Sequence, residues 1–170
     1  MMKPFVLCLT LALLTGCSSL NQPKKPTPGP RPDGIVILLN DPSGNVYTDL
    51  RTVSTWQGNP HLRRFYLISN YNEPRRVRDN PPVYIASSRV INVVNCDTHQ
   101  RAVFERIYFS DYWGEGEAIA KRGAVGQWES YPEESLIGIV AGMTCQIKPE
   151  RLKPEPAKDT RPTLLGGFDA

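Results

Sequence analysis

The stretch that decides the fold runs from Val83 to Tyr112 and reads VYIASSRVINVVNCDTHQRAVFERIYFSDY. Its two halves, residues 83–95 and 101–112, are rich in Val, Ile, Tyr and Phe, which favour strands. The short polar stretch 97–100 between them is typical of a turn. We therefore predict an antiparallel hairpin made of the two strongest strands of the chain.

Shorter strand patterns flank this hairpin. The β-branched run 34–39 is followed by the turn residues 40–44. Segments 46–56 and 62–68 are separated by Gly58, Asn59 and Pro60, which predicts a second hairpin, and a further strand is expected at 117–121. By contrast, segment 70–82 (NYNEPRRVRDNPP) carries three prolines and three arginines, so we expect an exposed loop outside the sheet.

One segment near the C-terminus has helical periodicity. Residues 132–134 (Pro-Glu-Glu) are typical of a first helical turn. Apolar residues then recur at helical spacing up to Cys145, at Leu136, Ile137, Ile139, Val140 and Met143. Several antiparallel strands and one helix predict an α+β fold: a mainly antiparallel β-sheet with one C-terminal amphipathic helix packed on it.

The N-terminus has the features of a bacterial lipoprotein signal. Lys3 supplies a positive charge, 5–14 is an apolar run too short to span a bilayer as a helix, and Leu14-Thr15-Gly16-Cys17 fits a lipobox. We expect residues 1–16 to be a signal peptide and Cys17 to carry acyl chains. The alternative is a buried N-terminal strand or helix. Serines rather than aspartate follow Cys17, which favours the outer membrane.

A location outside the cytoplasm affects whether the remaining cysteines are expected to be oxidised. Cys8 leaves with the signal peptide, so Cys96 and Cys145 remain, and outside the cytoplasm such a pair is expected to form a disulfide. The bond would clamp the end of a strand to the end of the helix. Two cysteines with the distant His61 and His99 are too few ligands for a metal site, so we expect no metal.

Composition divides the chain into four segments. After the signal peptide, residues 17–33 contain the lipidated cysteine and a proline-rich tether, and residues 34–147 form the folded domain. Residues 148–170 combine prolines with alternating charges, which predicts a disordered tail. The net charge of +3 is too small to indicate nucleic-acid binding.

Catalytic patterns are missing from the sequence. His99 lies near Cys96, but a cysteine in a disulfide is no free thiolate. The nucleophile-elbow, zinc-protease and phosphate-loop motifs do not occur. We expect a protein that is not an enzyme and uses no cofactor.

Arginines offer the best candidate for a binding site. Five of them fall within sixteen positions, interleaved with Tyr66 and Tyr71, and they are Arg63, Arg64, Arg75, Arg76 and Arg78. Arginine makes planar bidentate contacts to carboxylate, sulfate and phosphate groups, so these residues are candidates for binding an acidic ligand. The alternative is that they keep a loop soluble and pair with Glu73 and Asp79.

Segment 46–145 contains an ordered series of features: Ser88 and Arg89 ahead of Cys96, the run Tyr112-Trp113-Gly114-Glu115-Gly116, Trp128, and Pro132 and Ser135 before the closing Cys145. In this series the segment resembles the surface-adhesin protein E family of Gram-negative outer-membrane lipoproteins. The resemblance implies a small α+β lipoprotein with a Cys96–Cys145 bond that often forms a homodimer through its sheet. Characterised members bind host matrix and plasma proteins such as laminin, vitronectin and plasminogen.

Together these observations lead us to expect an outer-membrane lipoprotein that acts as a surface-exposed, adhesin-like binding module. The alternative is a periplasm-facing accessory or inhibitor lipoprotein that binds another envelope component. Both would use the same anchor, fold and basic segment.

Overall fold

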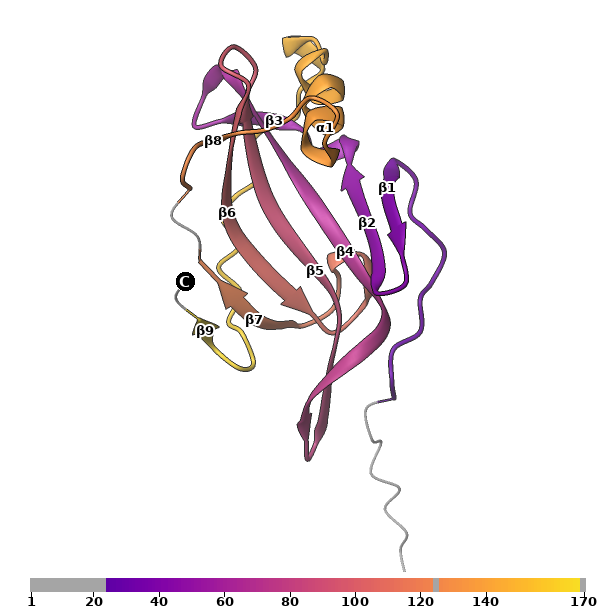
Figure 1. Cartoon of the computed structure of the whole chain (residues 1–170). Coiled ribbons are helices and arrows are strands. Elements are labelled where there is room, and N and C mark those ends of the chain that lie inside the picture. Colours follow the sequence, from indigo (N-terminus) through magenta and orange to yellow (C-terminus); the bar gives the residue numbers. More distant parts are fainter. Residues whose placement is uncertain (1–23, 124–125, 169–170) are drawn as a thin grey trace, which may run out of the picture.

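The computed structural model describes residues 24–123 and 126–168, so the predicted signal peptide and Cys17 lie outside the described residues. One twisted sheet, shown in Figure 1, forms the body of the domain. Its strands in spatial order are β1 (Ile35–Asp41), β2 (Gly44–Asp49), β4 (Asn59–Asp79), β5 (Pro82–Asn95), β6 (Gln100–Phe109), β7 (Ala118–Arg122) and β9 (Gly167–Phe168). The short β3 (Ser54–Trp56) pairs with β4 and β8 (Glu129–Ser130) pairs with β6. No helix in the described segments is long and apolar enough to cross a membrane.

The predicted hairpin is confirmed as β5 and β6. Its register pairs Asn95 with Gln100 at the turn and Ser87 with Phe109 at the far end. His99 adopts a positive φ of 52° in this turn. Apart from the parallel pair of β7 and β9, the strands pair in antiparallel fashion.

The prediction of a loop at 70–82 is wrong. Strand β4 continues through 21 residues to Asp79, and its end forms a long hairpin with β5 that projects beyond the rest of the sheet (Figure 1). The prolines fit because each occupies a position where the ladder needs no N–H group. Pro74 falls in the register shift between Asn70 and Arg75, and Pro82 is the first residue of β5.

Helix α1 (Leu136–Cys145) packs on one face of the sheet. The Ser135 hydroxyl caps it by accepting the Gly138 N–H at 3.1 Å, so the helix begins after the predicted Pro-Glu-Glu turn. Its buried residues Ile137, Val140 and Ala141 join Val53, Phe65 and Val94 of the sheet in the main core. The predicted apolar face is partly wrong, because the side chain of Ile139 points outward and is 56% exposed.

The predicted disulfide is confirmed. Cys96 directly follows β5 and Cys145 is the last residue of α1, and their sulfur atoms are 2.05 Å apart. The bond joins the helix to the sheet at the end opposite to the long hairpin (Figure 1).

Segment 148–170, which its composition predicts to be a disordered tail, is described up to residue 168 and lies against the sheet. After a 3-10 turn at Pro149–Arg151, residues 153–168 run along the sheet, and we call this segment the C-terminal strap. Its backbone bonds to the sheet at both ends, from the Lys153 N–H to the Val53 carbonyl at 2.9 Å and from the Leu165 N–H to the Ile119 carbonyl at 2.8 Å. The prolines and charges of the strap do not prevent these contacts, because the strap bonds to backbone carbonyls of the sheet and to an arginine that is far away in sequence.

Asp159 is the central attachment of the C-terminal strap. Its carboxylate lies 2.8 Å from Nη2 of Arg161 and 3.2 Å from Nη2 of Arg89, and its carbonyl accepts the Lys121 ammonium at 2.5 Å. The hydrogen bond from Arg161 is the main cause that lowers the pKa of Asp159 from its ordinary 3.8 to about 2.

This pKa makes the attachment sensitive to acid. A group with a lowered folded pKa stabilises the fold above its unfolded pKa, so the contribution is complete above about pH 5 and is lost as the pH falls toward 2. We expect a loss of on the order of 1 kcal/mol, since Arg161 is half exposed and its charge is screened. Amide hydrogen exchange at Leu164 and Leu165, corrected for intrinsic rates, should speed up across this range. The Asp159→Asn variant should show fast exchange already at pH 6; slow, pH-independent protection in both proteins would contradict the assignment.

The N-terminal segment enters the domain beside the long hairpin. Lys25 pairs with Glu73 on β4, and Lys24 and Pro26 line a depression together with Arg78. The described part of the predicted tether therefore rests against the hairpin rather than standing free. The chain reaches the domain from the end at which the hairpin projects (Figure 1).

Candidate functional site

A groove of about 960 Å³ lies beside the β4–β5 hairpin. We call it the hairpin groove. The residues that define it come from four strands, and they are Tyr71, Arg75, Val77, Ile85, Tyr108 and Arg122. The groove combines two cationic side chains with tyrosines and aliphatic groups, and Glu73, which pairs with Lys25, also lines it.

Strand pairing explains why these residues meet. Arg75 stands directly opposite Ile85 in the β4–β5 ladder. On the neighbouring pair, Tyr108 stands opposite Ala120, and Arg122 lies two residues further along β7 on the same face. The long hairpin, which the sequence did not predict, is what brings Arg75 to this face.

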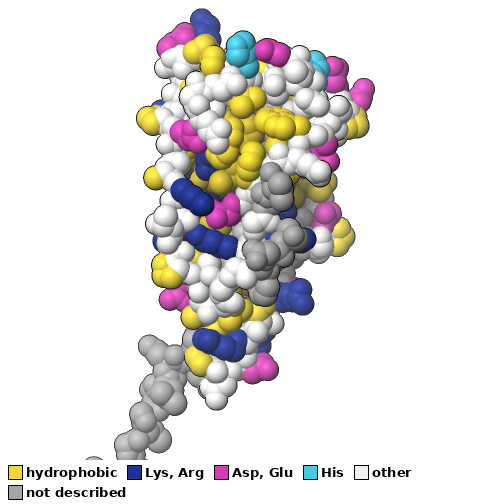
Figure 2. Space-filling model, turned by 90° about the vertical axis from the view of Figure 1, so that its left-hand side faces the viewer, with side chains coloured by type: hydrophobic (Ala, Val, Ile, Leu, Met, Phe, Trp, Pro, Cys, Tyr) yellow, Lys and Arg dark blue, Asp and Glu magenta, His cyan; other side chains and the backbone are white. Residues whose placement is uncertain are grey.

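The charges in the groove are available to a ligand. Arg75 and Arg122 are exposed, and within the described chain neither guanidinium has an ion-pair partner. The hydroxyl of Tyr71 donates to Ser88 Oγ at 3.2 Å, and Arg106 donates to the same oxygen at 2.9 Å. Figure 2 shows Lys and Arg side chains interspersed with apolar ones over the lower half of the side that carries β6, β7 and β9. Such a surface suits carboxylate or phosphate groups on a partner with apolar parts.

The five arginines proposed from the sequence do not form one patch. Only Arg75 lines the hairpin groove. Arg76 pairs with Asp79, with 3.2 Å between Nε and Oδ1, and Arg78 donates to the Pro81 carbonyl at 3.2 Å. The pairing of Arg76 with Asp79 agrees with the alternative of a solvated, self-paired segment.

Arg63 and Arg64 lie in the other half of β4 and are buried, at 6% and 2% exposure. Arg63 donates to the Pro60 carbonyl at 2.6 Å, and Arg64 faces a separate cavity. Arg122, in contrast, was not singled out from the sequence. The predicted strand 117–121 ends one residue before Arg122.

The histidines form no catalytic arrangement with Cys96, whose sulfur is in the disulfide. His61 Nδ1 lies 2.6 Å from Asp97 Oδ2, and His99 Nδ1 lies 3.7 Å from Glu133 Oε1, all on exposed side chains. In the part of the chain that the structure covers, no three His, Cys, Asp or Glu side chains gather as metal ligands would.

The aromatic Gly-x-Gly run has a structural role in this chain. Trp113 has a positive φ of 66° in the 3-10 turn Tyr112–Gly114, and its ring packs edge-on against Tyr47 with 4.9 Å between centroids. Its backbone N–H donates to Asn70 Oδ1 at 2.9 Å, and the Gly114 N–H donates to Ser87 Oγ at 3.0 Å. These two hydrogen bonds hold the turn against strands β4 and β5.

Comparison with known proteins agrees with these features. The sequence model of the family described as Surface-adhesin protein E matches residues 36–146. Surface-adhesin protein E from two strains of Haemophilus influenzae, NTHi 3655 and KW20/Rd, is 26% identical over 127 residues, which cover 71% of this chain and 78% of the relative.

Solved structures of H. influenzae protein E share the fold. One aligns with a TM-score of 0.55 at 18% identity and covers 69% of this chain and 88% of the other. Another, from a non-typeable isolate, aligns with a TM-score of 0.54 at 19% identity and covers 69% and 79%. The chain belongs to the surface-adhesin protein E family, as a distant homologue of the H. influenzae protein.

Proposed function

We propose that this protein is a lipid-anchored surface adhesin that binds a host matrix or plasma protein through the hairpin groove. The observation that carries the proposal is the pair of exposed arginines, Arg75 and Arg122, which have no ion-pair partner among the described residues and are set among tyrosines and aliphatic side chains. Family membership supports the adhesin role. The partner would present carboxylate or sulfate groups next to apolar side chains.

The proposed anchor and the fold together suggest how the domain would be presented. Acyl chains on Cys17 would hold the protein on the outer membrane, because each buried methylene contributes about 0.8 kcal/mol. The chain enters beside the long hairpin, so the hairpin end would lie nearer to the membrane. The groove opens on a face of the sheet, and a partner would reach it from the side.

Neutralising the groove should weaken binding and leave the fold intact. We expect the variant Arg75→Gln/Arg122→Gln to bind immobilised vitronectin, laminin or plasminogen at least about tenfold more weakly than wild type. Its melting temperature should not change, because neither side chain is buried or paired within the described chain. Biolayer interferometry with the three host proteins measures the first effect and thermal denaturation the second.

The control is Lys148→Gln/Arg151→Gln, which removes the same charge from exposed positions beside the 3-10 turn Pro149–Arg151. If both double variants lose affinity equally, net charge rather than the groove explains binding. Unchanged affinity of the groove variant for every host protein that wild type binds would overturn the site assignment.

A further inference from the structure

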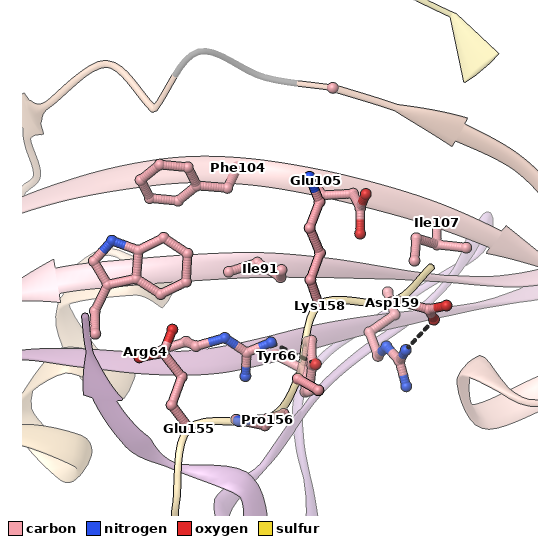
Figure 3. Close-up of a pocket in the computed structure, with 14 residues that line it drawn as sticks. Arg64, Tyr66, Ile91, Phe104, Glu105, Ile107, Glu155, Pro156, Lys158 and Asp159 are labelled. Atoms are coloured by element: carbon pink, nitrogen blue, oxygen red, sulfur yellow. Dashed lines mark hydrogen bonds and ion pairs between the residues drawn. The ribbon is translucent and has the colours of Figure 1, made fainter. Parts of the chain in front are cut away.

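A second cavity, of about 350 Å³, lies between the sheet and the C-terminal strap. Arg64 and Tyr66 of β4 and Ile91 of β5 line its sheet side, and residues 155–159 of the strap line the other side (Figure 3). Side chains alternate along a strand, so these residues point away from the face on which Phe65 packs against α1. The volume is in the range of small-molecule sites.

Arg64 is a buried cation that forms no ion pair with any residue that the structure describes. It is only 2% exposed, its guanidinium lies 4.2 Å from the centre of the Tyr66 ring, and Nη2 donates to the Tyr66 hydroxyl. Its Nη1 has no hydrogen-bond partner, and no carboxylate of the described segments pairs with it. Burying a charge costs free energy unless an opposite charge and hydrogen bonds compensate it. An anion bound in the cavity next to Arg64 would reduce this cost.

The acidic residues Glu105, Glu155 and Asp159 also line the cavity, but within the described segments none of them forms an ion pair with Arg64. Asp159 pairs with Arg89 at 3.2 Å, and Glu155 accepts a backbone N–H from the turn after β3 at 2.7 Å. The side chain of Lys158 extends from the strap toward Glu105 on β6 (Figure 3). None of these carboxylates satisfies the free nitrogen of Arg64.

The remaining walls are apolar and partly aromatic. Trp56 and Phe104 lie with ring centroids 4.8 Å apart and planes tilted by 35°, and Ile91 and Ile107 add aliphatic surface. One buried guanidinium beside flat apolar walls favours a small ligand that joins a carboxylate to a ring.

We infer that this cavity binds a small aromatic carboxylate, with its carboxylate on Arg64 and its ring against Trp56 and Phe104. The site is separate from the hairpin groove, to which it contributes no residue. Its outer wall, residues 155–159, lies beyond residue 146, where the match to the family ends. The ligand also links the strap to the sheet, because both sides of the cavity contact it.

Phenylacetate is the probe that tests this site. The full chain, purified in a non-ionic detergent, is titrated while the indole N–H signal of Trp56 and the backbone signals of 155–159 are followed by NMR. We expect saturable shifts with a dissociation constant below about 1 mM, and at least about tenfold weaker binding of the neutral isostere phenylacetamide. Arg64→Met should reduce phenylacetate binding by a similar factor, and Arg151→Gln, an exposed arginine outside the cavity, should not.

A second variant keeps the test informative if Arg64→Met fails to fold. Ile91→Phe keeps the charge of the cavity and fills its volume, so it should also abolish phenylacetate binding while the fold remains intact. Absence of saturable shifts in wild type would overturn the inference. So would equal affinity for phenylacetamide, shifts confined to the hairpin groove, or wild-type binding in a folded Ile91→Phe variant.

Discussion

Replacing Cys96 and Cys145 together by alanine is expected to lower the free energy of unfolding by about 4 kcal/mol. The bond closes a loop with a sequence separation of 49 residues, and in the chain-entropy model a loop of that size restricts the unfolded chain by this amount. Helix α1 depends on the bond in particular, because Cys145 is its last residue and the helix has only ten residues.

Equilibrium urea unfolding of the double-alanine variant and of wild type measures this effect. Wild type unfolded in the presence of a reductant is the matched control, since it loses the bond without a change of sequence. A difference below about 1 kcal/mol in both comparisons would contradict the role given to the disulfide.

The Phe65→Ala variant is expected to lose about 3–5 kcal/mol of stability. Phe65 is fully buried in β4, and its ring belongs to the core shared by Val53, Val94 and the α1 residues Val140 and Ala141. Removing the ring leaves a cavity between sheet and helix, and the disulfide restrains the helix from closing it.

Ile139→Ala is the matched control for Phe65→Ala. It also truncates an apolar residue, but Ile139 is 56% exposed on α1, so we expect a change of less than about 0.5 kcal/mol. Urea unfolding of both variants checks the assignment. Similar losses for the two would mean that the helix packs with a face different from the one described.

The sequence predicted the parts of the fold that depend on local pattern. The β5–β6 hairpin combines β-rich runs with a polar turn, and the Pro-Glu-Glu stretch 132–134 with the apolar residues after it predicts the helix. The prediction from sequence failed where pairing between strands far apart in the chain overrides local composition. The end of β4 was expected to be a loop because of its prolines, yet the bulge at Pro74 and the turn before Pro82 accommodate them.

The candidate site was predicted only in part, for the same reason. Arg75 was identified from a run of arginines, but Arg122 joins it only through the pairing of β7 with β6. Arg64 was assigned to the same cluster as Arg75, and the alternation of β4 instead buries it beneath the C-terminal strap. The packing of the strap did not follow from its composition, because Asp159 and backbone groups rather than a buried apolar face hold it.

The most direct test of the proposed function is protease treatment of intact cells, because a host protein can bind only a domain displayed outside the outer membrane. The mature domain is detected by blotting, with a known periplasmic lipoprotein as the control for leakage. Surface display predicts that the domain signal disappears in intact cells while the periplasmic control stays protected. Protection of the domain until the outer membrane is permeabilised would contradict the adhesin role and support a periplasm-facing accessory or inhibitor lipoprotein.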